Sequence, residues 1–208
     1  MIELLVATTN SGKFAEVQAF LRKLPLKILS LKDLTEPPTV IEDGATFEDN
    51  ACKKARVLAE FSGLLTLADD SGLEVDALNG APGIYSARYA GEEGDDERNN
   101  QKLLRELEDV PDERRTARFV CALALCAPRS KQCSEELTAR ESCEGRIALR
   151  SPDRTASATI RYFLSTIRTK LSARSSCAIK ATVSHRGKGA GETWPRHCRL
   201  LIDLRAKP

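Results

Sequence analysis

Residues 2–13 read IELLVATTNSGK, an unbroken apolar run that ends in a polar, glycine-containing turn. A continuous apolar run of this length predicts a strand that is buried on both faces, as in a parallel sheet. After the turn, apolar residues recur at helical spacing from Lys13 to Leu24, and Pro25 ends the pattern. Strand, polar turn and helix in this order favour an α/β fold.

Two further segments predict short apolar strands. LKILSL at 26–31 predicts the second strand, and LLTLA at 64–68 predicts the third. The third segment leads directly into DDSG at 69–72, which we expect at the carboxyl end of the strand. Ligands bind at that end in open α/β sheets. The other predicted elements are a helix near 96–108 and a long strand over 114–127.

A helix is predicted between the second and third strands. Thr46 suits its N-cap, and Glu48 and Asp49 lie in its first turn, where the helix dipole favours negative charge. Gly63 suits the residue that ends the helix. The residues expected on the buried face of this helix are Ala51, Ala55, Leu58 and Phe61.

Composition indicates a globular protein with one domain over residues 1–208. Hydrophobic residues make up 41% of the chain and charged residues 30%, and no apolar run approaches the roughly 18 residues of a membrane span. The start of the chain lacks the pattern of a signal peptide, so we expect a cytoplasmic protein with no membrane partner. The seven cysteines form no C-x-x-C pair, and two histidines are too few for a three-histidine metal site. Any metal is therefore expected to be held mainly by oxygen.

Charge is divided unevenly along the chain. Residues 1–128 carry 15 Lys and Arg against 23 Asp and Glu, a balance of −8, whereas residues 129–208 carry 17 against 7, a balance of +10. The two balances sum to the net charge of +2. One interpretation is a basic arm that binds nucleic acid, since Lys and Arg neutralise phosphates. The other is that the basic composition reflects a shifted reading frame rather than a selected function.

Three groups of residues have the types that phosphate chemistry needs. The turn from Thr8 to Lys13 offers backbone N–H groups, hydroxyls and one lysine at a helix start, which can cradle phosphate although it is not a P-loop. Glu42 and Asp70 offer the hard oxygen ligands that suit Mg²⁺, and a carboxylate beside the metal can take a proton from water. SHRGK at 184–188 offers donors for a phosphate or a base carbonyl oxygen. Taken singly, each group is also compatible with an ordinary solvent-facing loop.

Four segments together are more specific than any single group. They are ATTNSGKFAEV (7–17), IEDGATFEDNACKKA (41–55), LADDSGLEVDALNGAPGIYSARYAG (67–91) and CEGRIAL (143–149). In order and spacing they resemble the inosine triphosphate pyrophosphatase family. The resemblance implies an α/β fold with an elongated, twisted central mixed sheet, flanking helices, and two lobes around a nucleotide cleft.

The resemblance also implies an activity and a site. It implies Mg²⁺-dependent hydrolysis of non-standard purine nucleoside triphosphates, namely ITP, dITP and XTP, to the monophosphate and pyrophosphate. It also implies that the protein is a homodimer. Glu42 and Asp70 would hold Mg²⁺, and Asp70 would be the general base for the water that attacks the α-phosphorus. His185 and Arg186 would donate to the 6-keto oxygen of the purine, which disfavours a 6-amino purine. The substrate-binding positions implied are Thr8, Thr9, Asn10, Ser11, Gly12, Lys13, Lys54, Ser71, Lys180, His185 and Arg186.

One family motif is absent from the chain. Between CEGRIAL and SHRGK the family carries Gly-Phe-Gly-Tyr-Asp-Pro, whose aromatic residue stacks on the base, whereas residues 150–183 here differ throughout. Codons for Phe-Gly-Tyr-Asp-Pro-Leu-Phe, read from their second nucleotide, give Ser-Ala-Thr-Ile-Arg-Tyr-Phe, and residues 157–163 are SATIRYF. We therefore hypothesise that 150–183 and 189–208 are read in a shifted frame, while 1–149 follow the family.

Two alternatives to an active enzyme stay open. If the altered interval removes the wall on which the base stacks, the chain is a catalytically impaired homologue that binds nucleotide. If the basic arm is selected, the chain is a nucleic-acid-binding protein. The enzyme hypothesis, in contrast, expects a small-molecule nucleoside triphosphate as substrate and no nucleic-acid partner.

Overall fold

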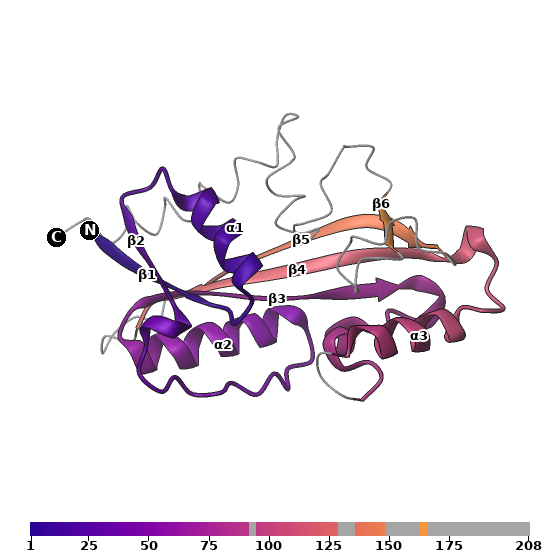
Figure 1. Ribbon diagram of the computed structural model, residues 1–208, viewed down its shortest axis with the longest axis horizontal. Helices are drawn as coiled ribbons and strands as arrows, with labels where there is room; N and C mark the ends of the chain where they lie inside the picture. Colours follow the sequence, from indigo (N-terminus) through magenta and orange to yellow (C-terminus); the bar gives the residue numbers. More distant parts are fainter. Residues whose placement is uncertain (92–94, 129–135, 149–162, 166–208) are drawn as a thin grey trace. The chain divides into compact units, whose positions relative to one another are not determined.

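The computed structural model describes residues 1–91, 95–128, 136–148 and 163–165 (Figure 1). The α-helices in these ranges are α1 (Ser11–Leu21), α2 (Phe47–Ser62) and α3 (Asp96–Glu106), and the short 3₁₀ helices are η1 (Leu31–Asp33), η2 (Asp76–Leu78), η3 (Gly83–Arg88) and η4 (Asp112–Arg114). The strands are β1 (Ile2–Ala7), β2 (Leu26–Ser30), β3 (Leu65–Val75), β4 (Thr116–Cys126), β5 (Glu136–Ile147) and β6 (Phe163–Ser165). None of the helices described is both long enough and apolar enough to cross a membrane.

The described strands form one sheet in the order β2-β1-β3-β4-β5-β6. Strand β1 pairs in parallel with both β2 and β3, whereas β5 and β6 pair antiparallel, so the sheet is mixed. Parallel neighbours need a crossover connection, and α1 provides it between β1 and β2. Helix α2 follows β2 in the chain and leads to β3, which pairs with the other edge of β1. The sheet confirms the predicted α/β class.

The chain divides into two compact units. The described residues of the first unit fall within Met1–Asp70 and Ala122–Arg140, and those of the second within Ser71–Cys121 and Glu141–Ala178. Strands β3, β4 and β5 each contribute residues to both units. The single domain over 1–208 and the two lobes around a nucleotide cleft stay predictions.

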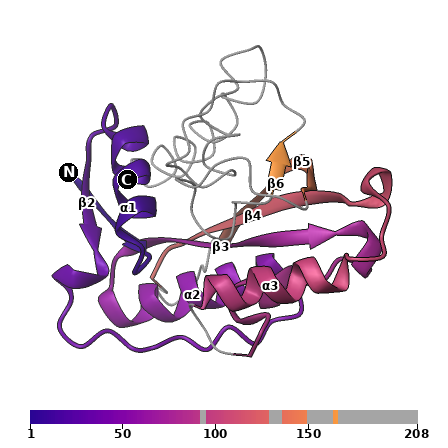
Figure 2. The same ribbon diagram turned by 45° about the vertical axis from the view of Figure 1, so that its right-hand side comes forward.

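The core of the first unit forms where α1 packs on the sheet. Strand β1 is buried from Leu4 to Ala7, as expected for a strand covered on both faces. Both views of the ribbon place α1 and α2 on opposite sides of this part of the sheet (Figures 1 and 2). The buried members of the α1 cluster are Leu4, Val6, Val17, Leu21, Leu65, Leu67 and Leu125.

The ends of α2 follow the sequence prediction. The Thr46 hydroxyl accepts a hydrogen bond from the N–H of Asp49 at 3.0 Å, and the Asp49 carboxylate accepts one from the N–H of Thr46 at 3.1 Å. This reciprocal capping satisfies two donors that a helix start otherwise leaves without partners. Gly63 ends the helix with a φ of 70°, a left-handed conformation that glycine adopts without steric cost.

Three of the six buried residues of α2 are alanines. Ala51, Ala55 and Leu58 are buried as predicted, but Phe61 is 48% exposed, so that prediction is wrong. Phe61 lies in the last turn of α2, two residues before the Gly63 cap, and the last buried residue of the helix is Ala59 instead. Small side chains on this face let α2 approach the sheet closely.

Candidate active site

The turn that precedes α1 is held by Asn10. Its Oδ1 accepts hydrogen bonds from the backbone N–H groups of Gly12 at 2.9 Å and Lys13 at 3.1 Å, so Asn10 is the N-cap of the helix. The hydroxyl of Thr8 accepts from the N–H of Asn10 at 3.2 Å. The predicted phosphate turn is therefore an ordered helix start, in which Thr9, Asn10, Ser11 and Gly12 are exposed.

Asp69 and Asp70 lie within β3 rather than after it. The predicted end of the strand at Ala68 is wrong, because β3 continues to Val75. The parallel pairing of β3 with β1 does end at Ala68, so the two aspartates lie beyond the carboxyl end of β1. Neighbouring residues of a strand point to opposite faces, which directs the two carboxylates to different sides of the sheet.

Asp69 faces the phosphate turn. Its Oδ2 lies 2.5 Å from the Nζ of Lys13, and the exposed fractions of the two side chains are 13% and 24%. The pair joins the start of α1 to β3 inside the first unit. A lysine held this way is placed beside the turn and carries a positive charge that an anionic ligand can share.

Lys54 of α2 links two other parts of the same region. Its Nζ forms an ion pair with the Glu42 carboxylate and donates to the backbone carbonyl of Asp69 at 3.0 Å. Because one ammonium group contacts both, the Glu42 carboxylate lies close to the backbone that carries Asp69 and Asp70. Lys54 and Glu42 are both partly exposed, with side-chain fractions of 18% and 29%.

Asn50 provides a second link one helical turn before Lys54. Its Nδ2 donates to Oδ2 of Asp70 at 2.9 Å, and its Oδ1 accepts from the backbone N–H of Gly44 at 2.8 Å. Helix α2 thus ties the loop of Glu42 to β3 at two successive positions. Sequence reasoning missed Asn50, and the signal that could have found it is a polar amide beside Ala51 on the buried face.

Comparison with known proteins identifies the family. The model of the Ham1 family matches residues 4–193. The chain belongs to the Ham1 family. The relationship implied by the sequence motifs is thereby confirmed.

Relatives of this Ham1 chain include bacterial proteins named dITP/XTP pyrophosphatase. The protein from Geobacter sulfurreducens is 59% identical over 132 residues, which span 64% of this chain and 66% of that protein, just under two thirds. The protein from Exiguobacterium sibiricum is 44% identical over 187 residues, 90% of this chain and 92% of that protein. A crystal structure named nucleoside-triphosphatase / dITP/XTP pyrophosphatase, from Mycobacterium abscessus, has 40% identity and a TM-score of 0.72, and covers 90% of this chain and 95% of that chain.

The structure describes one of the four other predicted binding residues of the Ham1 chain. Ser71 follows Asp70 in β3 and is the first residue of the second unit. Lys180, His185 and Arg186 lie outside the described residues, as do the segments 150–183 and 189–208 apart from β6. The predicted recognition of the purine stays a prediction.

The donor set at Glu42 and Asp70 fits a magnesium ion. Within the described ranges, no group of three or more Asp, Glu, His or Cys side chains is placed to hold a metal. Mg²⁺ commonly takes only one or two carboxylates from a protein and completes its shell with water and substrate phosphates. Two carboxylates from segments that α2 holds together, one of them supported by an amide donor, meet that requirement.

Proposed function

We propose that this Ham1 chain hydrolyses ITP, dITP and XTP to the monophosphate and pyrophosphate, with Mg²⁺ as cofactor. Membership of the family and the names of its relatives support a nucleoside triphosphate pyrophosphatase. The observation in this chain that carries the proposal is the double link from α2. Through Asn50 and Lys54 it brings the loop of Glu42 to the strand of Asp70.

The charge of the cluster supports a role for a metal. On the side of the sheet that faces α2, Glu42 and Asp70 carry two negative charges and Lys54 carries one positive charge, so their sum is −1. A cluster with a net negative charge repels a triphosphate. A divalent cation changes the sum to +1, which favours the anionic substrate.

The chain's own residues would divide the chemical work. The polar groups of the exposed residues 9–12, together with Thr8 and the ammonium of Lys13, would bind the phosphate chain. Bound Mg²⁺ would supply charge neutralisation at the phosphates. Asp70 would accept a proton from a water molecule whose oxygen forms the new bond to the α-phosphorus. The bond from that phosphorus to the bridging oxygen breaks, and pyrophosphate leaves with the bond electrons.

Asp70→Asn tests the assignment. The amide keeps the size of the side chain. It cannot accept the proton of the attacking water, and it lacks the negative charge that attracts Mg²⁺. We expect pyrophosphate release from ITP to fall by at least about 10²-fold, with unfolding close to that of the wild type. The matched control is Asp43→Asn, which removes an exposed carboxylate that pairs with Lys53 at 2.5 Å and should keep activity. Wild-type turnover in Asp70→Asn contradicts the proposal.

A nucleotide panel separates the proposed enzyme from the alternatives. The panel consists of ITP, dITP, XTP and ATP. Turnover and binding of each nucleotide are measured in Mg²⁺, without added metal, and in EDTA. Hydrolysis of the first three but not of ATP supports the proposal, whereas binding without turnover indicates an impaired homologue. Salt-dependent binding of RNA or DNA would favour the basic-arm hypothesis.

The homodimer and the cytoplasmic location stay predictions. Light scattering on the purified chain tests the homodimer.

A further inference from the structure

Asn50 is a polar side chain in a fully buried position. It is 0% exposed, and a buried amide is stabilised only when hydrogen bonds replace those it made to water. Its two partners differ in kind: the N–H of Gly44 donates, and the carboxylate of Asp70 accepts. Since an amide oxygen only accepts and an amide nitrogen only donates, these partners fix the orientation of the Asn50 side chain.

Gly44 fits tightly against the start of α2. A Cβ at this position would lie 2.6 Å from Cβ of Asp49 and 2.8 Å from Oδ1 of Asn50, distances that side chains essentially never show. The loop can approach the helix closely enough to reach Asn50 only because residue 44 is glycine. Gly44 is two residues from Glu42, so this contact also restrains the loop that carries that carboxylate.

Asn50 differs in one respect from Lys54, its neighbour along the helix. Lys54 is partly exposed and is predicted to contact phosphate, so its present bonds can be exchanged when substrate binds. Asn50 has no exposed surface and cannot touch a substrate. It can affect the reaction only through Asp70 and through the loop at Gly44.

We infer that Asn50 is a positioning residue that holds the Asp70 carboxylate and the Glu42 loop in one arrangement before metal and triphosphate bind. The inference rests on the proposed function, since it assigns a role toward the proposed base and metal ligands. Loss of a residue that hydrogen-bonds a metal-ligating carboxylate typically lowers metal affinity or activity by about 10–100-fold. Burial alone predicts no such specific effect.

The test uses the full chain with two substitutions at position 50. Asn50→Leu is similar in size and removes both hydrogen bonds. Asn50→Asp keeps an acceptor for Gly44, removes the donor toward Asp70 and places a second carboxylate beside it. The measurements are kcat and KM for ITP at saturating Mg²⁺, the dissociation constant of Mn²⁺ without nucleotide by electron paramagnetic resonance, and thermal unfolding.

Asn99 of α3 provides a matched control. It is 7% exposed, accepts from the N–H of Ala90 at 2.6 Å and donates to the carbonyl of Ala87 at 3.1 Å. Its amide therefore also bridges a helix and a loop, but its acceptor is a backbone carbonyl rather than a carboxylate. Asn99→Leu should lower the unfolding temperature as Asn50→Leu does and leave kcat and Mn²⁺ affinity within about twofold of the wild type.

The expected result is a selective loss at position 50. For Asn50→Leu, kcat falls and the Mn²⁺ dissociation constant rises by about 10–100-fold, while KM for ITP changes by less than about threefold because the turn before α1 is untouched. Asn50→Asp also loses kcat. If Asn50→Leu does not fold, Gly44→Ala carries the test, because its Cβ displaces the Asn50 amide, and the same two losses are expected.

Three outcomes overturn the inference. The first is wild-type kcat and Mn²⁺ affinity in Asn50→Leu, or in Gly44→Ala where Asn50→Leu does not fold. The second is a loss of kcat and Mn²⁺ affinity in Asn99→Leu that equals the loss in Asn50→Leu. The third is a wild-type kcat in Asn50→Asp. The failure of the proposed function is recognised separately. If the wild type releases no pyrophosphate from ITP, that function fails, while the comparison of Mn²⁺ affinities still tests Asn50. A wild type that neither turns over ITP nor binds Mn²⁺ overturns both.

Discussion

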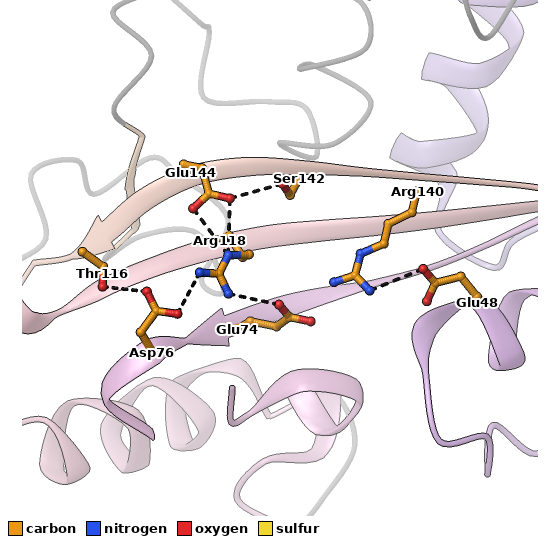
Figure 3. Close-up of polar contacts among 8 residues, drawn as sticks. All are labelled: Glu48, Glu74, Asp76, Thr116, Arg118, Arg140, Ser142 and Glu144. Atoms are coloured by element: carbon orange, nitrogen blue, oxygen red, sulfur yellow. Dashed lines mark hydrogen bonds and ion pairs between the residues drawn. The ribbon is translucent and has the colours of Figure 1, made fainter. Parts of the chain in front are cut away.

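Replacement of Arg118 by methionine should destabilise the second unit through charge. The guanidinium lies among three carboxylates (Figure 3). Its nitrogens are 2.7 Å from Asp76, 3.3 Å from Glu144 and 3.4 Å from Glu74. Methionine keeps most of the apolar stem and leaves the three carboxylates facing one another without their shared cation.

The magnitude follows from exposure. The Arg118 side chain is 31% exposed, and those of Glu74, Asp76 and Glu144 are 20%, 43% and 58% exposed. Solvent screens the two more exposed pairs, and exposed pairs contribute about 0.2–1 kcal/mol each. We therefore expect Arg118→Met to lower the free energy of unfolding by about 1–2 kcal/mol at pH 7.

The matched control is Arg146→Met. Arg146 has a single partner shown by the described structure, Asp112 at 2.6 Å, and both side chains are about half exposed. One such pair contributes less than about 1 kcal/mol. Urea unfolding followed by circular dichroism measures both variants in low salt and in about 1 M NaCl, where the Debye length falls to about 3 Å and charge effects shrink.

The pH dependence of the Arg118 effect has a defined sign. The Thr116 hydroxyl, at 2.6 Å, and then Arg118 hold the pKa of Asp76 below its ordinary value. A carboxylate whose pKa is lowered by folding contributes stability above its unfolded pKa of about 3.9 and loses it as pH falls through the folded pKa. The difference between wild type and Arg118→Met should therefore be constant from pH 7 to about 5 and shrink below about 4. The charge argument is refuted if Arg146→Met loses as much, or if the loss at Arg118 persists in high salt and acid.

Three further changes have direct readouts. Thr46→Ala removes the cap of α2 and should lower the free energy of unfolding by about 1 kcal/mol in urea titrations; no change would contradict the capping role. Arg115 is 2% exposed and donates to the carbonyls of Val110 and Glu108 after α3. Arg115→Met should therefore lower the free energy of unfolding by about 1–3 kcal/mol. A smaller loss than in Thr46→Ala would refute the role of these hydrogen bonds. Burial, and then the nearby Glu136 carboxylate, raise the pKa of Cys52 to about 12. Iodoacetamide at pH 8 should therefore modify this thiol at least about 10²-fold more slowly than the same thiol in the unfolded chain. Peptide mass mapping measures the two rates.

The elements predicted correctly from sequence are those with strong local signals. The apolar run of β1, the capping residues of α2 and the glycine that ends it are each determined by neighbours in the chain. Strand β5 was not predicted, because its buried residues alternate only near its end, at Cys143, Gly145 and Ile147. The rest of β5 is mostly polar and is half-buried or exposed, so its position depends on pairing rather than on its own composition.

The site was predicted in part for the same reason. The turn at 8–13 and the pair Glu42 and Asp70 could be named from motifs, but their partners depend on tertiary structure. The sequence places Asp69 and Asp70 together as one acidic pair, whereas alternation along β3 gives them different roles. Asp69 meets Lys13 and Asp70 meets Asn50, and only the position of β3 between α1 and α2 decides which carboxylate meets which helix.

Helix α2 connects the stability of the fold to the geometry of the site. Its cap fixes the start of the helix at Thr46, whose carbonyl accepts from the N–H of Asn50 at 3.2 Å. That start determines which residues face β3, and the next turn then places Lys54 on the same side. A change that frays the first turn must therefore loosen the contacts of Asn50 with Gly44 and Asp70 before it unfolds the protein. For this reason Thr46→Ala should lower metal affinity in the same direction as Gly44→Ala, by less, and the two effects should not be additive, because both act through the amide of Asn50.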